Sequence, residues 1–275
     1  MVVFFFIFGL TIGSFLNSVI YRLDIGESLI KARSHCPYCK KPLSWFELIP
    51  LMSFILQKGR CRHCKKTISL QYPLVELAAG LLFVLIFNFS AQGEISPLWG
   101  GQFLNILTTI FWLFVISCLI IIFVYDLRHY IIPDQVIYPA IIVAILYRLQ
   151  FSIFNFSAYG GPAAGWHSLI FYNLLSAVIA GGFFLLIILI SKGKWMGAGD
   201  AKLAVFMGLI LGWPKIFLAL FLAFLIGAFV SVILMILKKK TLKSEIPFGP
   251  FLAGATVIAM FLGDILINLY LKLFI

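Results

Sequence analysis

The chain has 275 residues, of which 63% are hydrophobic and only 11% are charged, and its formal net charge is +11. Soluble globular domains carry about twice that charged fraction, so the composition excludes an ordinary soluble protein and favours segments surrounded by lipid. In a membrane protein the basic residues mainly report topology, and we expect no nucleic-acid partner.

Long apolar runs predict an all-α polytopic membrane protein with about eight transmembrane helices. The expected spans are approximately residues 2–20, 73–90, 103–125, 136–155, 168–190, 201–213, 216–237 and 248–271. The sixth run is short for a bilayer crossing of about 20 residues, which suggests a tilted, buried or broken helix. A cleaved signal peptide is a poor interpretation of the first run, because no basic residue precedes it and Arg22 follows it.

The distribution of Lys and Arg predicts the orientation. With the N-terminus outside, the segments 22–71, 126–135, 191–202 and 238–246 hold 10, 1, 3 and 4 of these residues, together 18 of 21. Because basic residues are retained in the cytoplasm during insertion, we expect these segments to be cytoplasmic. The expected domains are a first span at 1–21, a cytoplasmic four-cysteine domain at 22–71 and a transmembrane core at 72–275. Basic loops beside a membrane contact anionic headgroups, so membrane lipids are expected partners.

The first cytoplasmic segment contains two Cys-x-x-Cys pairs. They are formed by Cys36, Cys39, Cys61 and Cys64, with 21 residues between the pairs. Two such pairs let four thiolates converge tetrahedrally on one Zn²⁺, and disulfides are disfavoured in the cytoplasm. Four thiolates close the coordination sphere, so we expect a structural zinc in a small zinc-ribbon-like loop domain. His63 is an alternative fourth ligand, and Cys118 is expected to be an inert core residue.

Two aspartates stand at the expected cytoplasmic boundary. Asp126 follows the apolar run of the third span, and Asp200 begins the sixth span after a Gly-rich turn. Two adjacent carboxylates share a proton, so that one activates water while the other polarises a scissile carbonyl, as in aspartic proteases. The alternative for Asp134 and Asp200 is helix capping. Capping does not explain Asp126 at a helix C-terminus, where the alternative is a solvated loop residue.

These features together resemble the type IV prepilin peptidase family, a group of GxGD aspartyl membrane proteases. The matching motifs are residues 13–17 (GSFLN), the four-cysteine loop followed by 72–76 (YPLVE), 126–134 (DLRHYIIPD), 197–202 (GAGDAK) and 246–251 (IPFGPF). The resemblance covers nearly the whole chain. It implies that Asp126 and Asp200 are the catalytic aspartates of a peptidase in the bacterial cytoplasmic (inner) membrane, with its active site facing the cytoplasm.

The resemblance also implies the substrates and a second activity. Members of the family remove the leader from prepilins and pseudopilins of type IV pilus and type II secretion systems, typically between a glycine and a phenylalanine. Many also N-methylate the new terminus with S-adenosylmethionine, whose binding residues in this chain are unknown. Glu47 and Glu76 are candidates for that activity, with hydrogen-bonding or helix-end roles as the alternative. Gly249 and Pro250 could shape a wall near the aspartates, or simply begin the last helix.

Other functional classes remain as alternatives. A transporter could use Asp126 and Asp200 as a proton or cation relay. Transport favours carboxylates near the midplane and inverted repeats, and the sequence indicates neither. A membrane zinc sensor would use the cysteine loop and leave the aspartates incidental. A related enzyme alternative is a presenilin-like or archaeal preflagellin-type peptidase. The four-cysteine loop argues against both, because those groups typically lack it.

Overall fold

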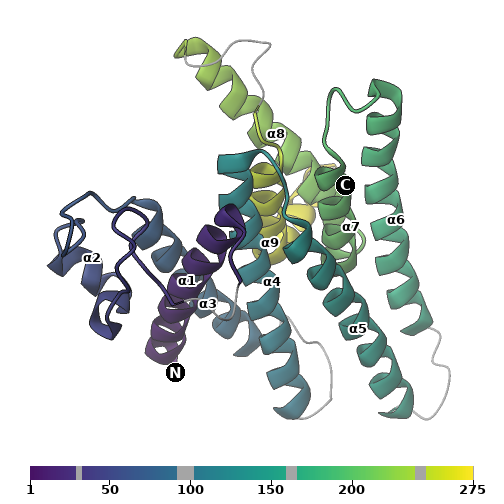
Figure 1. The fold of residues 1–275 in the computed structure, drawn as a ribbon. Coiled ribbons are helices and arrows are strands. Elements are labelled where there is room, and N and C mark those ends of the chain that lie inside the picture. Colours follow the sequence, from purple (N-terminus) through teal and green to yellow (C-terminus); the bar gives the residue numbers. More distant parts are fainter. Residues whose placement is uncertain (29–32, 92–101, 159–165, 239–245, 275) are drawn as a thin grey trace. The chain divides into compact units, whose positions relative to one another are not determined.

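The computed structural model describes the backbone of residues 1–28, 33–91, 102–158, 166–238 and 246–274 (Figure 1). Side chains are described for 1–28, 33–90, 106–150, 171–238 and 246–273. The elements in chain order are α1 (Val2–Ile25), the 3-10 helix η1 (Trp45–Leu48), α2 (Met52–Leu56), α3 (Gln71–Ala91), α4 (Gln102–His129), α5 (Asp134–Ala158), α6 (Trp166–Ser191), α7 (Ala198–Leu211), α8 (Lys215–Ile236) and α9 (Gly249–Phe274). Within the described ranges there is no strand beyond two isolated β-bridges.

Six of the described helices are long and apolar enough to cross a membrane. They are Val2–Ile25, Gln71–Ser90, Ile106–His129, Phe171–Ser191, Lys215–Ile236 and Gly249–Leu273. The predicted all-α polytopic membrane class is therefore confirmed. The predicted span at 136–155 lies in α5, whose side chains beyond residue 150 are outside the described residues. The predicted span at 201–213 corresponds to α7, which has only 14 residues.

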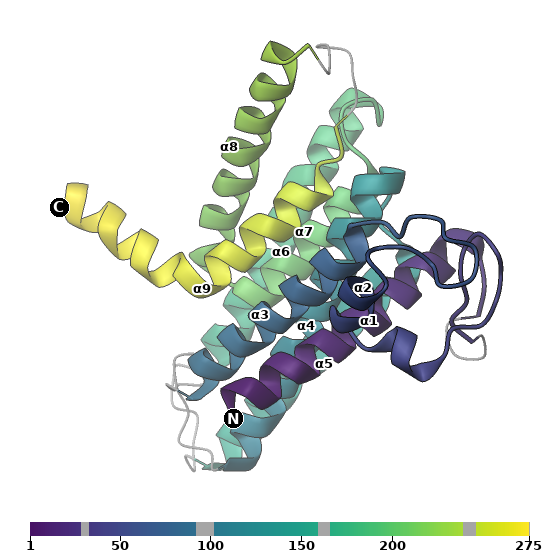
Figure 2. The same cartoon turned by 90° about the vertical axis from the view of Figure 1, so that its left-hand side faces the viewer.

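The chain divides into two compact units, Met1–Ile121 and Ile122–Ile275. In the first unit α1 packs along α3 (Figure 2). The two helices approach closely at glycines, since a Cβ atom on Gly13 would lie 2.7 Å from the Glu76 Cα and one on Gly9 would lie 2.8 Å from the Gly80 Cα. The four-cysteine loop connects these two helices. The division at 1–21, 22–71 and 72–275 stays a prediction.

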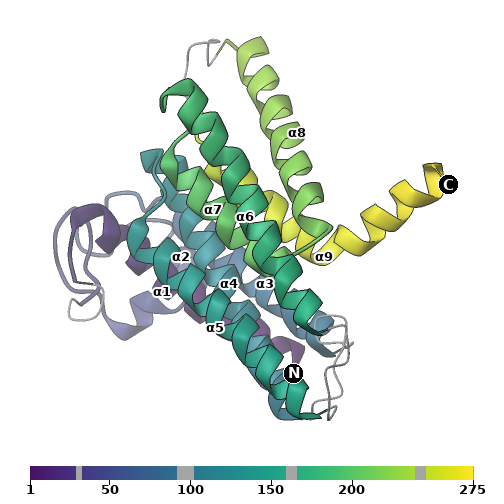
Figure 3. The same cartoon turned by 90° about the vertical axis from the view of Figure 1, so that its right-hand side faces the viewer.

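In the second unit the short helix α7 is the most buried element. It packs against α5, α6, α8 and α9, and Figure 3 shows α6 running along it. Its core side chains include Leu203, Phe206 and Met207. The Arg148 guanidinium on α5 donates hydrogen bonds to the carbonyls of Leu209 (3.0 Å) and Ile210 (2.8 Å). These carbonyls belong to the last turn of α7 and have no partner within the helix, so Arg148 satisfies them and opposes the negative end of the helix dipole.

Candidate active site

Asp126 lies in the last turn of α4. The helix ends at His129, and the backbone turns at Tyr130, whose φ is 59° and whose N–H donates to the Asp126 carbonyl at 2.9 Å. The Asp126 residue is only 4% exposed, and its Oδ2 has no hydrogen-bond partner among the described residues. The alternative of a solvated loop residue is therefore wrong. A carboxylate buried at a helix C-terminus is unfavourable, so helix stability gives no reason for its position.

Asp200 lies in the first turn of α7, which begins at Ala198. Its Oδ2 accepts a hydrogen bond from the Gly197 N–H at 3.3 Å, so this oxygen takes part in capping the start of α7. Burial first, and the negative charge of Asp126 second, raise the pKa of Asp200 to about 7, against the lowering effect of the Gly197 N–H. The structure thus brings Asp126 close enough to influence the protonation of Asp200.

The start of α9 closes this site from a third side. A Cβ atom on Gly249 would lie 2.6 Å from the Asp126 Oδ2 and 3.3 Å from the Ile132 Cδ1. A Cβ atom on Gly199 would lie 3.1 Å from the Ile132 Cβ. Ile132 is therefore buried between the turn that precedes Asp200 and the first residue of α9. Gly249 therefore lies beside the Asp126 carboxylate, and Pro250 stands in the first turn of α9, as the helix-start alternative expected.

An ion pair between Asp134 and Lys202 joins the start of α5 to the start of α7. The Lys202 Nζ donates to the Asp134 Oδ1 at 2.6 Å and lies 4.7 Å from the ring centroid of Tyr138. Asp134 is the first residue of α5, where a carboxylate favours the positive end of the helix dipole. Its carboxylate is used in this ion pair, which was not predicted. The two partners are 68 residues apart in the chain, and no local pattern identifies such a pair.

The four cysteines of the first unit form a compact cluster. Their Sγ atoms all lie within 4.8 Å of one another, and none is in a disulfide. The Cys36 and Cys61 N–H groups donate to the carbonyls of the residues five positions later, at 2.9 and 2.8 Å. One β-bridge accompanies each pair, His35 with Pro42 and Arg60 with Thr67. The two pairs are therefore matching knuckles whose thiols face one another. His63 is not part of the cluster.

Glu47 and Glu76 both make hydrogen bonds that hold the loop. The Glu47 Oε2 accepts the Ser44 N–H at 2.8 Å at the start of η1. The Glu76 Oε2 accepts the Leu51 N–H at 2.9 Å. The expected helix-end and hydrogen-bonding roles are thus observed. Cys118 is buried in the apolar part of α4, in agreement with the expected core role.

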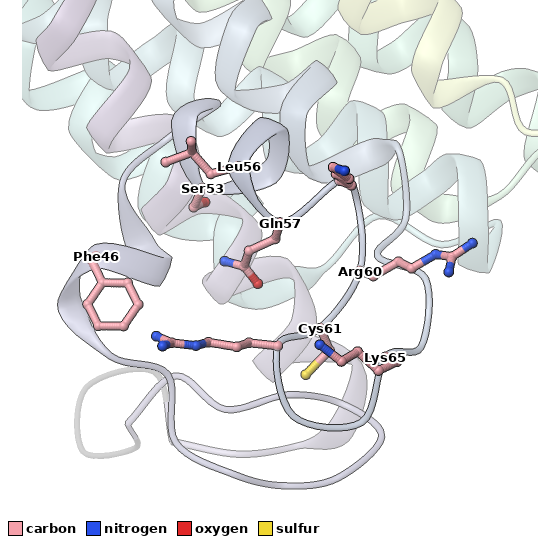
Figure 4. A pocket seen from close by; sticks show the side chains of 9 residues that line it. Phe46, Ser53, Leu56, Gln57, Arg60, Cys61 and Lys65 are labelled. Atoms are coloured by element: carbon pink, nitrogen blue, oxygen red, sulfur yellow. The ribbon is translucent and has the colours of Figure 1, made fainter.

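The loop also encloses an open cavity of about 720 Å³ (Figure 4). Two of its lining side chains, Phe46 and Leu56, are apolar, and Lys58, Arg60, Arg62 and Lys65 are basic. The Arg62 guanidinium lies 5.2 Å from the ring centroid of Phe46. Among the described residues no acidic side chain lines the cavity, so its charge is complementary to an anion.

Comparisons with known proteins give a consistent result. Residues 7–89 match the bacterial peptidase A24 N-terminal domain, and residues 113–232 match the type IV leader peptidase family. The chain is similar to a prepilin leader peptidase/N-methyltransferase of Aeromonas hydrophila (34% identity over 98% of this chain and 93% of that protein). It is also similar to the protein of the same name from Bacillus subtilis strain 168 (32% identity over 98% of this chain and 97% of that protein). The protein of that name from Klebsiella pneumoniae is 34% identical over 80% of this chain and 89% of that protein. No solved structure matches the chain.

Proposed function

Because the chain belongs to the type IV leader peptidase family, we propose that it is an aspartyl endopeptidase that removes the leader peptide of prepilin-like proteins. The proposed catalytic residues are Asp126 and Asp200. The observation that carries the proposal is the pairing of a buried Asp126 carboxylate with an Asp200 whose pKa is raised to about 7, partly by the Asp126 charge.

The chemistry follows from one proton held between two carboxylates. Near neutral pH the ionised carboxylate accepts a proton from a water molecule as the water attacks the scissile carbonyl carbon. The protonated carboxyl donates its hydrogen bond to the carbonyl oxygen as negative charge develops there. Collapse of the tetrahedral intermediate breaks the C–N bond, and a carboxyl proton passes to the leaving amine.

We further propose that the new N-terminus is methylated with S-adenosylmethionine as the methyl donor. The methylation proposal rests on the name of the related proteins, which includes N-methyltransferase. The loop cavity does not fit the donor's sulfonium, because four basic side chains line it. Glu47 and Glu76 each already accept a backbone hydrogen bond through one oxygen. We assign no residue of this chain to the methyl donor.

The cysteine cluster is proposed to hold one structural zinc within the domain at 22–71. The fit rests on four thiols within 4.8 Å and on the matching backbone hydrogen bonds of the two knuckles. The N–H of Cys64, as the largest influence, lowers the pKa of Cys61 to about 7, whereas burial raises the pKa of Cys36 to about 11. Cys61 therefore favours the thiolate that a metal requires, and Cys36 would have to give up its proton on binding. Bound zinc would supply a tetrahedral link between the two knuckles, and four thiolates leave it no position for a reacting water.

The proposed location is the bacterial inner membrane, with the aspartates facing the cytoplasm. The proposed partners are prepilin or pseudopilin peptides of a type IV pilus or type II secretion system and the membrane lipids. The transporter alternative is disfavoured, because Asp126 lies three residues from the end of α4 and Asp200 lies at the start of α7. A relay across the membrane requires carboxylates near the midplane.

Cleavage of a prepilin-like substrate tests the peptidase proposal. Asp126→Asn and Asp200→Asn are each expected to abolish cleavage while the protein remains folded. Asp264→Asn is the matched control, since Asp264 also lies in the second unit but is exposed and paired with Lys215 at 2.6 Å. Wild-type cleavage by either of the first two variants would remove that aspartate from the catalytic pair.

A further inference from the structure

Four strongly exposed apolar side chains of the four-cysteine loop lie in η1 and α2. Trp45, Met52, Ile55 and Leu56 are 78%, 58%, 70% and 77% exposed, and we call these four residues the interfacial surface. Met52, Ile55 and Leu56 have the i, i+3, i+4 spacing of one helix face, and η1 packs against α2. None of the residues of α2 is buried. An exposed group of this kind marks a contact with a protein or a membrane.

Hydrogen bonds fix the depth of this surface relative to the membrane helix α3. The Leu51 N–H, directly before α2, donates to the Glu76 Oε2 at 2.9 Å. Glu76 is five residues into α3, which corresponds to about 7.5 Å along the helix axis. The Asn17 Nδ2 of α1 also donates to the Tyr72 carbonyl at 3.0 Å. The start of α2 is therefore level with the second turn of a membrane-spanning helix, and not held away from it in water.

The interfacial surface borders the cavity that carries the basic side chains. Leu56 belongs both to the surface and to the wall of the loop cavity, which also carries Lys58, Arg60, Arg62 and Lys65 (Figure 4). Exposed apolar residues with a tryptophan, next to a cluster of cations, match the two parts of an anionic lipid: acyl chain and phosphate.

We propose that the interfacial surface inserts into the headgroup region of the leaflet where α3 begins, and that the basic residues of the loop cavity bind phosphates of anionic phospholipids. The four-cysteine loop then lies on the bilayer and is held at a fixed height beside the helix ends. This inference does not depend on the proposed peptidase activity. It depends on contacts within the first unit and on α1 and α3 crossing the membrane.

Photolabelling of the full-length chain in lipid nanodiscs tests the insertion. A diazirine-bearing amino acid is placed at position 56 in one variant and at position 41 in another, because Leu56 belongs to the interfacial surface and Lys41 is an exposed residue of the same loop that does not line the cavity. We expect the probe at 56 to label phospholipid several times more than the probe at 41. Labelling of this polypeptide or of a second copy, or equal lipid labelling at both positions, would overturn the insertion.

A charge variant tests the phosphate contact. Lys58 and Lys65 have φ values of 52° and 59°, which asparagine tolerates, so Lys58→Asn/Lys65→Asn removes two charges without straining the backbone. We expect the preference of the position-56 probe for phosphatidylglycerol over phosphatidylcholine to fall about tenfold. Lys192→Asn/Lys238→Asn is the matched control, with φ values of 52° and 54° outside the loop. An unchanged preference in the first variant, or an equal loss of preference in the control variant, would refute lipid phosphate binding at the loop cavity.

Discussion

Gly249 holds no functional group, yet its replacement by alanine should impair cleavage strongly. The new Cβ would lie 2.6 Å from the Asp126 Oδ2 and 3.1 Å from its Cγ, whereas ordinary contacts begin at 3.4 Å. The carboxylate must therefore move by about 0.8 Å, or the start of α9 must move instead. A displacement near 1 Å of a catalytic group costs about 10²-fold in rate. We accordingly expect kcat/KM to fall about 10²-fold, which is about 2.7 kcal/mol of transition-state stabilisation.

The assay is cleavage of a prepilin-like peptide by purified protein in proteoliposomes, with thermal unfolding measured in parallel. Gly254→Ala is the matched control, because it lies in the same helix and its Cβ would meet nothing within 4 Å. The control should cleave at the wild-type rate, because its new methyl group meets no neighbouring atom. If Gly249→Ala cleaved within about twofold of the wild type, the Asp126 carboxylate would not require its observed position, and the proposed geometry would be refuted.

Three further predictions concern zinc, pH and folding. Freshly reduced protein should contain one zinc per chain by metal analysis and Cys36→Ser should contain less; metal-free wild-type protein would contradict the cluster's proposed role. Because the pKa of Asp200 is raised to about 7, this carboxyl is protonated below that pH and ionised above it, so kcat/KM should fall as pH rises beyond 7. A flat profile from pH 5 to 9 would contradict a shared proton. Arg148→Met should lower the unfolding temperature, because the Leu209 and Ile210 carbonyls of α7 lose their hydrogen-bond donor, at a cost of about 2–3 kcal/mol. An unchanged unfolding temperature would show that other groups satisfy these carbonyls.

The features that the sequence predicted well are local ones. Apolar length and hydropathy decide whether a segment can cross a membrane, and the six apolar helices follow the predicted runs. The spacing of Cys36, Cys39, Cys61 and Cys64 was enough to predict a cluster, because each knuckle is closed by hydrogen bonds within a few residues. The motif resemblance to prepilin peptidases is confirmed by the family matches.

The features that the sequence could not predict are contacts between distant segments. The approach of Gly249 to Asp126 joins residues more than 100 positions apart, and it is made by a backbone without a side chain. The Asp134–Lys202 ion pair and the Arg148 contacts to α7 are of the same kind. Arg148 is one of the three basic residues outside the four segments expected to be cytoplasmic. Its hydrogen bonds to the end of a short buried helix supply a reason for its position.

The central claim is that Asp126 and Asp200 act on one proton as a pair. The most direct test is a pH titration of the aspartate carboxyl carbons by NMR, in full-length protein labelled at aspartate and held in lipid. A transition near pH 7 should disappear in Asp200→Asn. It should move to lower pH in Asp126→Asn, because removal of the neighbouring charge lowers the pKa of Asp200. An Asp200 titration that Asp126→Asn leaves unchanged would show that the two carboxyl groups do not interact.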